Sequence, residues 1–280
     1  MIEYKIRLSS CECSIAEWNP DGKHLVLALH GWLDNLATFE KLAKYLDDVR
    51  IIAIDLPGHG HSEHLSEGRV YHFIDSVFIL DDLIEHLQLD SVNLLGHSMG
   101  GAIASIYAAI QPLRVNKLLL IEAIGPVTGP ASQTLESLTK AVSSRRALKD
   151  KRKPVYSTFE GALMARAEVS KIAPNLIKPL VERALTKVDG GYTWRADSRL
   201  RTPSAIRMSE QQVRDLLAAI TSPVLLIEGE SGMLRGKQAQ HIQDRKPLLN
   251  DLSIHLMKGG HHLHLEYPET IAKQISAFLK

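Results

Sequence analysis

The chain has 280 residues, of which 45% are hydrophobic and 23% are charged. These proportions are ordinary for a globular protein, and the length suits one large domain or a core with an inserted subdomain. The formal net charge of +1 gives no electrostatic reason to expect a nucleic acid or an acidic surface as partner. No uninterrupted apolar stretch is long enough to cross a bilayer, so no membrane association is expected.

The N-terminal residues 1–7 alternate in the manner of a strand and lack the apolar run of a signal peptide. Cys11 and Cys13 follow on the next expected strand, where neighbouring side chains rarely have disulfide geometry. We interpret them as reduced thiols rather than a zinc site, because no second ligand pair has suitable spacing. Reduced cysteines indicate a cytoplasmic protein.

In the first 125 residues, apolar segments of strand type alternate with segments of helical periodicity. Strands are expected at 3–8, 11–18, 24–29, 50–54, 92–95 and 117–121, and helices at 38–46, 73–87 and 101–109. The strands are apolar throughout rather than alternating, which is typical of a parallel sheet covered on both faces.

The alternation stops near Gly125 and Pro126, and no strand is expected from there to about residue 219. Helices are expected at 132–142, 158–169, 176–186 and 210–220, before strands return at 224–227 and 253–257 and a final helix covers 270–279. We therefore predict an α/β core formed by residues 1–125 and 220–280, which is interrupted by a helical cap at 126–219.

Residues 96–100 read Gly-His-Ser-Met-Gly and fit the pattern G-x-S-x-G. A strand is expected before this motif and a helix after it, which is the context of a nucleophile elbow. Ser98 is therefore the candidate nucleophile, and the backbone N–H of Met99 at the helix start can face an oxyanion. The glycine patterns of phosphate-binding and dinucleotide-binding loops are incomplete in this chain, so no cofactor is expected.

Four motifs together resemble those of the α/β-hydrolase fold superfamily. They are His-Gly at 30–31, Asp-Leu-Pro-Gly-His-Gly at 55–60, Gly-His-Ser-Met-Gly-Gly at 96–101, and Gly-His-His-Leu-His-Leu-Glu at 260–266. The insertion and the Gly-Gly-His-His-Leu-His ending are similar to the serine hydrolase-like group within that superfamily. The resemblance implies a mostly parallel sheet with helices on both faces, and a triad in the chain order Ser, acid, His.

The resemblance also assigns the base and the second oxyanion donor. It places the base directly after the small residues of the ending, which selects His261, with His262 and His264 as alternatives. Three histidines within four residues also suggest metal ligands, but an acidic partner of the H-E-x-x-H type is missing, so no metal is expected. The second backbone N–H of the oxyanion hole comes from Trp32, whose side chain either lines the pocket or belongs to the core.

The triad acid departs from the common pattern of the superfamily. Most relatives carry it in a Gly-x-x-Asp segment after the strand at 224–227, where this chain has Gly232 in place of the aspartate. A second location, known from haloalkane dehalogenases, follows the strand after the nucleophile helix, and Glu122 stands there. Glu122 is the preferred acid, and Glu230 and Glu228 are the alternatives.

Several other polar residues are weighed as candidates. Asp55 and His59 are expected to shape the floor of the site rather than to react. The basic run at 145–153 is interpreted as a solvated cap surface rather than a nucleic-acid site. Two readings stay open for a polar group between the cap helices: it grips a substrate carboxylate, or it pins the cap to the core. The group comprises Trp194, Arg195, Asp197 and Arg207.

The sequence thus predicts a serine hydrolase that acts on a small to medium carboxylic ester through an acyl-enzyme. An acyltransferase or thioesterase on the same fold is the alternative chemistry. A non-catalytic ligand-binding protein is the other alternative, because Gly232 leaves the usual acid position empty. The sequence does not indicate the physiological substrate or the oligomeric state.

Overall fold

A computed structural model of the chain describes residues 1–235 and 239–280. Its centre is an eight-stranded sheet in the order β1-β2-β4-β3-β5-β6-β9-β10. Strand β2 pairs antiparallel with both of its neighbours, β1 and β4, and all other neighbouring strands are parallel. The strands are β1 (Ile2–Arg7), β2 (Glu12–Trp18), β3 (His24–Leu29), β4 (Val49–Ile54), β5 (Val92–His97), β6 (Val115–Ile121), β9 (Val224–Gly229) and β10 (Leu252–Met257). The prediction of a mostly parallel sheet is confirmed.

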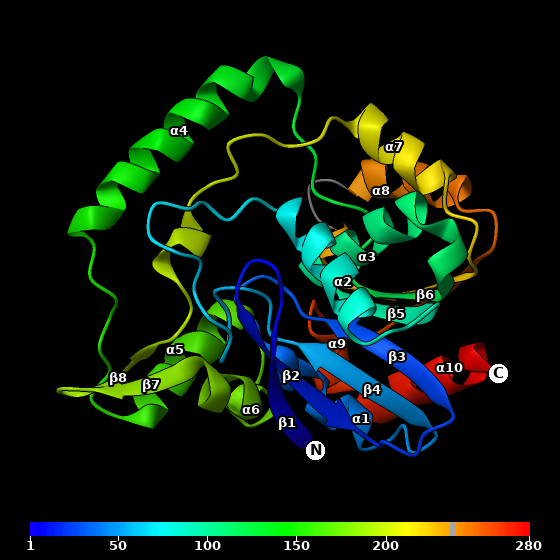
Figure 1. The fold of residues 1–280 in the computed structure, drawn as a ribbon, viewed down its shortest axis with the longest axis horizontal. Helices are drawn as coiled ribbons and strands as arrows, with labels where there is room; N and C mark the ends of the chain where they lie inside the picture. Colours follow the sequence, from blue (N-terminus) through cyan, green and yellow to red (C-terminus); the bar gives the residue numbers. More distant parts are fainter. Residues whose placement is uncertain (236–238) are drawn as a thin grey trace.

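Helices cover both faces of this sheet (Figure 1). Successive strand residues alternate between two apolar clusters, so Leu27 and Leu29 pack with α2, α3 and α7, whereas Val26 and Ala28 pack with α1 and α10. The apolar strands follow from this arrangement, because both faces are buried. The helices outside the insertion are α1 (Glu40–Ala43), α2 (Asp75–His86), α3 (Met99–Ile110), α7 (Glu210–Ala218), α8 (Ala239–Arg245), α9 (Leu263–Glu266) and α10 (Pro268–Leu279).

The segment between β6 and α7 forms the insertion. It contains α4 (Thr134–Ala147), α5 (Phe159–Ser170), α6 (Pro174–Ala184), β7 (Leu185–Val188) and β8 (Gly191–Trp194). Figure 1 shows α4 spanning the upper left of the molecule, and α5, α6 and the β7–β8 pair below it. Helix α7 follows the insertion and packs on the core, since Val213 and Leu217 belong to the same cluster as Ile103 of α3.

The expectation that 126–219 lacks strands was wrong, because β7 and β8 pair as an antiparallel hairpin. Its turn contains Gly190 with φ +88° and Gly191 with φ +140°. The predicted helix at 176–186 ends earlier, at Ala184, so Leu185 and Thr186 belong to β7. Leucine and threonine fit either pattern over so short a strand, and the pairing across the hairpin decides their conformation.

A buried arginine connects the insertion to the sheet. Arg183 of α6 donates from Nε to Asp55 Oδ2 over 2.9 Å and from Nη2 to Glu3 Oε1 over 2.7 Å. Asp55 is fully buried and also accepts from the backbone N–H groups of Leu36 and His61. Asp55 therefore joins the insertion, the loop after β3 and its own loop, in keeping with the structural role expected for it.

Buried histidines and cysteines contribute to the interior of the same region. Burial lowers the pKa of His59 to about 3, so the ring is neutral at physiological pH. Cys11 and Cys13 are free and buried, with 3.7 Å between their sulfur atoms.

Among the helices of the described residues, none is both long and apolar enough to cross a membrane.

Replacing Arg183 by Met is expected to lower the free energy of unfolding by about 3–5 kcal/mol, because it leaves the buried Asp55 carboxylate without its cation. Urea unfolding followed by circular dichroism measures this change. Arg201, an exposed arginine of the same insertion, provides the control variant Arg201→Met. Equal stability of the two variants would contradict the structural importance of the Arg183–Asp55 pair.

Candidate active site

Ser98 stands on a sharp turn between β5 and α3. Its backbone has φ +52° and ψ −116°, an uncommon conformation for a residue with a side chain. A Cβ at Gly96 would lie 2.3 Å from Gly101 Cα, and a Cβ at Gly100 would lie 2.0 Å from the Leu29 carbonyl oxygen. The glycines are therefore required by the close approach of α3 to β3 and β5, which is the geometry of a nucleophile elbow.

The structure brings Ser98, His261 and Glu122 into one hydrogen-bonded chain. His261 Nε2 lies 2.9 Å from Ser98 Oγ, and His261 Nδ1 lies 3.3 Å from Glu122 Oε2. Ser98 follows β5 and Glu122 follows β6, which are adjacent parallel strands and end at the same edge of the sheet. His261 comes from the segment between β10 and α9, which reaches the same edge.

The sheet itself positions the first two of these residues. The Ser98 backbone N–H donates to the Ile121 carbonyl over 3.0 Å, and the Glu122 N–H donates to the Ile227 carbonyl over 2.9 Å. The backbone of Glu122 has φ +52°. The chain thus turns sharply directly after both strands, and each turn is held by the neighbouring strand.

The Glu122 side chain is fully buried and receives two backbone N–H groups. Gly229 donates to Oε1 over 2.7 Å, and Met233 donates to Oε2 over 2.6 Å. A Cβ on Gly232 would lie 2.2 Å from both carboxylate oxygens. The carboxylate of Glu122 therefore occupies the space next to the position where the resemblance expected an aspartate, and only glycine at 232 leaves that space free.

The alternative acids lie elsewhere. Glu230 is exposed on the loop after β9. Glu228 is buried and faces Lys246 Nζ over 2.7 Å and Arg235 Nη2 over 3.4 Å. Neither carboxylate has an interaction with His261 among the described contacts, so the geometry favours Glu122 as its acidic partner.

The alternative bases also have other partners. His262 Nε2 lies 3.3 Å from Asp34 Oδ2, and His264 Nε2 lies 2.6 Å from Thr38 Oγ1. His264 is fully buried, and burial holds its pKa well below the usual value. Of the three histidines between 261 and 264, His261 is the one whose imidazole contacts Ser98.

The electrostatics of the pair suit a neutral base beside an ionised acid. Burial lowers the pKa of His261, and the Glu122 carboxylate opposes this effect only in part, so the net pKa lies below the ordinary value. Burial by itself would raise the pKa of Glu122, but hydrogen bonds from His261 and the Gly229 N–H more than offset it. At neutral pH the imidazole is uncharged and the carboxylate is ionised.

Sequence analysis placed the backbone N–H groups of Trp32 and Met99 in an oxyanion hole. Met99 is the first residue of α3, so its N–H has no partner within the helix. Trp32 lies two residues after His30, in the loop that follows β3. Its side chain is 53% exposed, so the core alternative is wrong, and its indole Nε1–H donates to the Leu200 carbonyl over 3.0 Å.

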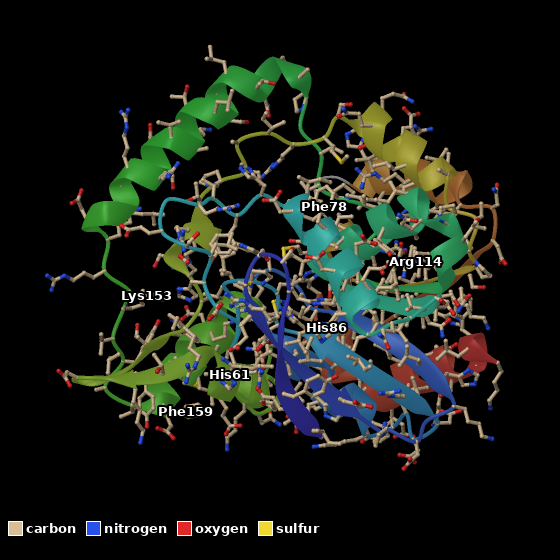
Figure 2. All side chains as sticks on the ribbon, in the orientation of Figure 1. His61, Phe78, His86, Arg114, Lys153 and Phe159 are labelled. Carbon is tan, nitrogen blue, oxygen red and sulfur yellow. The ribbon has the colours of Figure 1, made fainter. Side chains whose placement is uncertain are left out.

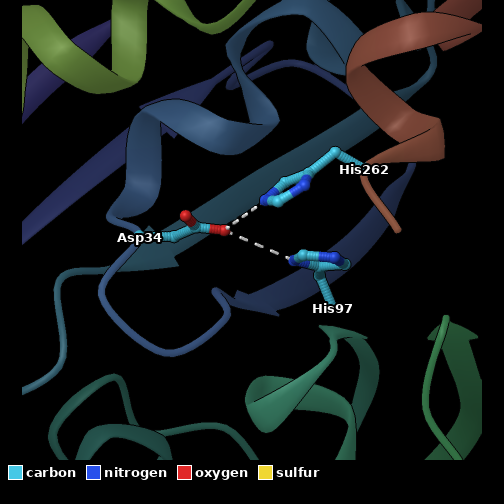
Figure 3. A group of neighbouring side chains, drawn as sticks. All are labelled: Asp34, His97 and His262. Carbon is cyan, nitrogen blue, oxygen red and sulfur yellow. Dashed lines mark ion pairs between the residues drawn. The ribbon is translucent and has the colours of Figure 1, made fainter. Parts of the chain in front are cut away.

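A second polar group, which sequence analysis missed, lies behind the base. His97 Nε2 lies 2.9 Å from the carbonyl oxygen of His261, and His97 Nδ1 lies 3.6 Å from Asp34 Oδ2. Asp34 also receives Nη2 of Arg166, from α5, at 2.6 Å from its Oδ1. We call Asp34, His97 and His262 the Asp34 cluster (Figure 3). His97 and His262 lie inside the motifs at 96–101 and 260–266, whereas Asp34 lies three residues beyond the His-Gly motif and had no sequence signal.

The polar residues proposed between cap helices make intramolecular contacts. Asp197 accepts from the Tyr71 hydroxyl over 2.9 Å, and its N–H donates to the Gly58 carbonyl. Arg195 Nε donates to the Leu185 carbonyl over 2.9 Å, and Trp194 packs edge-on against Tyr156. The Asp197 contacts favour pinning of the insertion to the core, whereas the side-chain contacts cited for Arg195 and Trp194 lie within the insertion. Arg207 borders a surface hollow beside α4.

The basic run at 145–153 is partly engaged in the same way. Arg145 Nη2 donates to the Gly68 carbonyl over 2.6 Å. Lys153 Nζ donates to the carbonyls of Trp194 and Arg195 over 2.9 and 3.1 Å, and Figure 2 labels it on the segment below α4. These contacts connect the end of α4 to neighbouring loops.

The chain is similar to known proteins in sequence and in fold. The model of the family described as "alpha/beta hydrolase fold" matches residues 24–268. A serine hydrolase-like protein from Danio rerio is 29% identical, with 94% of this chain and 83% of the relative covered. A probable serine hydrolase from Drosophila melanogaster is 31% identical over the same shares. A crystal structure of a hypothetical protein from Pseudomonas aeruginosa is 37% identical, covers 99% of both chains and has a TM-score of 0.93.

Replacing Glu122 by Gln is expected to lower the pKa of the His261 imidazole. The carboxylate raises that pKa by stabilising the imidazolium, and a neutral amide leaves the lowering effect of burial unopposed. A pH titration of the ring by NMR measures the change. Glu230→Gln is the control and should leave the pKa of His261 unchanged. An unchanged or raised pKa of His261 in Glu122→Gln would contradict the pairing of His261 with Glu122.

Proposed function

The chain belongs to the α/β-hydrolase fold family, and we propose that it is a serine hydrolase that cleaves a small to medium carboxylic ester through an acyl-enzyme. The observation that carries the proposal is the hydrogen-bonded chain from Ser98 through His261 to Glu122. The names of the similar proteins from Danio rerio and Drosophila melanogaster support hydrolase chemistry in general.

In the proposed acylation, His261 Nε2 removes the proton of Ser98 Oγ as this oxygen attacks the carbonyl carbon. The backbone N–H groups of Trp32 and Met99 hold the oxyanion that develops. When the tetrahedral intermediate collapses, the bond to the alkoxy group breaks and His261 returns the proton to the leaving alcohol.

Deacylation uses the same groups in the same roles. His261 removes a proton from water, the water oxygen attacks the acyl carbon, and the carboxylic acid leaves as Ser98 regains its proton. Throughout both steps Glu122 accepts the Nδ1–H of His261, which keeps Nε2 directed at the reacting oxygen and stabilises the imidazolium. The lowered pKa of Glu122 supports this role, because the carboxylate must remain ionised.

We also propose that the insertion acts as a cap on the core. The sequence placed this cap at 126–219 and the core at 1–125 and 220–280, and α7, at the end of the first range, packs on the core. The insertion begins a few residues after Glu122, and the indole of Trp32 donates to Leu200 within the insertion. The loop that holds a proposed oxyanion donor is thereby connected to the insertion. We assign the selection of substrate to this cap. Acyl transfer and thioester cleavage are alternative reactions for Ser98, His261 and Glu122.

The alternative of a non-catalytic binding protein was based on the glycine at position 232, where the triad aspartate was expected. The fit of the Glu122 carboxylate beside Gly232 removes that reason, because a carboxylate is supplied from β6 instead. The proposal of a working triad therefore requires no residue that the chain lacks.

A fluorophosphonate probe tests the proposal directly, because it labels an activated serine. The parent protein should be labelled, and Ser98→Ala should lose the label and lower the hydrolysis of nitrophenyl esters by roughly three orders of magnitude or more. Ser231→Ala is the control, since this exposed hydroxyl lies on the loop after β9 and bonds to the Gly259 carbonyl. A panel of esters and thioesters of graded acyl length then defines the substrate class.

Two outcomes would contradict the proposal. Undiminished labelling of Ser98→Ala would show that another residue reacts. A folded parent protein that neither takes the label nor cleaves any member of the panel would favour a binding protein.

A further inference from the structure

The Asp34 cluster converges from three segments that are far apart in the sequence. Asp34 lies in the loop after β3, His97 ends β5, and His262 precedes α9 (Figure 3). The exposed fractions of the three residues are 3%, 1% and 8%. One ligand atom from each residue, namely Asp34 Oδ2, His97 Nδ1 and His262 Nε2, lies within 4.8 Å of the other two.

Hydrogen bonding leaves two buried ring nitrogens of this cluster without a partner, His97 Nδ1 and His262 Nδ1, and the first of them faces Asp34. The His261 carbonyl only accepts, so His97 Nε2 must carry the proton that it donates there. In the neutral imidazole, Nδ1 then has a lone pair, and this atom faces the negatively charged Asp34 Oδ2 without a hydrogen bond. Two electron-rich atoms that face each other in a buried place call for a positive charge between them.

The spacing also fits a metal ion. The distances from Asp34 Oδ2 are 3.6 Å to His97 Nδ1 and 3.3 Å to His262 Nε2, and the first of them is too long for a hydrogen bond. Zinc bonds of about 2.0–2.1 Å place two ligand atoms of a tetrahedron about 3.3 Å apart. The two distances therefore agree with edges of a zinc coordination tetrahedron.

We propose that the Asp34 cluster binds one divalent transition-metal ion of the zinc class. The ligands are His97 Nδ1, His262 Nε2 and Asp34 Oδ2, a donor set of two imidazoles and one carboxylate that Zn²⁺ accepts. In His97 and Asp34, the polar atoms that would not bind the ion, Nε2 and Oδ1, already have partners. The Nε2–H of His97 donates to a backbone carbonyl, and Asp34 Oδ1 accepts from Arg166, as outer partners of metal ligands usually do.

Gly31 packs closely against the cluster. A Cβ on this residue would lie 3.0 Å from His97 Nδ1 and 3.2 Å from Asp34 Oδ2, which is tighter than ordinary van der Waals contact, so a larger side chain here would press on both ligand atoms. The protein itself supplies three ligand atoms.

The surrounding charges predict a weak and reversible site. Arg166 places a positive charge on the same carboxylate, and the imidazoles of His261 and His264 pack against His97. The guanidinium opposes a second cation, so its removal should tighten binding. The ion would touch neither Ser98 nor Glu122, and its ligands would connect it to the proposed base through the His261 carbonyl and through ring packing of His97 and His262 on His261.

Titration of the full-length protein with zinc chloride, measured by calorimetry and by metal analysis after dialysis, tests this site. One Zn²⁺ per chain is expected. His262→Gln and Asp34→Asn should each weaken binding by at least about tenfold, because each removes a ligand. His264→Gln is the matched control, since His264 belongs to the same group of rings but bonds to Thr38. It should bind zinc like the parent.

Arg166→Gln supplies an independent arm that misfolding cannot imitate, because its expected effect is a several-fold gain in zinc affinity. The same titrations on Ser98→Ala separate this site from the proposed hydrolase activity. Equal binding by the parent and both ligand variants would show adventitious binding elsewhere on the protein, and an equal loss in His264→Gln would show that the loss is not specific to the ligands. Either result, or absence of binding by the parent, would overturn the proposal.

Discussion

The Glu122 carboxylate rests in a space that exists because residue 232 is glycine, and the arrangement of the candidate site depends on this contact. The carboxylate is gripped by the N–H groups of Gly229 and Met233, so it ties the end of β6 to the loop after β9. The hydrogen bond with His261 and these two backbone hydrogen bonds together lower the pKa of this fully buried acid, which burial alone would raise. His261 then has a fixed anion on one side and Ser98 Oγ on the other.

The parallel sheet makes this contact possible, because β5, β6 and β9 end at one edge and are neighbours in the sheet. Ser98 and Glu122 both have φ +52°, a conformation that costs about 1–3 kcal/mol for a residue with a side chain. Both turns are pinned by backbone hydrogen bonds to the next strand, and both lie above densely packed apolar clusters. The stability of the sheet therefore holds the strained backbone that presents the two side chains.

Much of the fold could be predicted from the sequence, because buried parallel strands have continuous apolar runs and the elbow has a strict local pattern. The candidate Ser98 was reached from the elbow pattern, whereas the resemblance to the α/β-hydrolase fold assigned His261 and Glu122, the latter because Gly232 stands where an aspartate was expected. The β7–β8 hairpin was missed, since a four-residue strand leaves too little pattern to separate from the end of a helix. The Asp34 cluster was missed for a different reason. Its members join only when the loops after β3 and β5 meet the segment before α9, and no local pattern contains that information.

The central claim is that Glu122 is the triad acid, and replacing either Glu122 or Glu230 by glutamine tests it most directly. Substituting Glu122 by Gln preserves size but removes the charge that holds the imidazole, and it replaces one of the two acceptor oxygens by an NH2 donor. With an activated ester as substrate, kcat/KM of Glu122→Gln should fall by roughly three to four orders of magnitude, and Glu230→Gln should remain close to the parent. The large loss in Glu230→Gln together with near-parental activity in Glu122→Gln would contradict the account, because the acid would then come from the loop after β9.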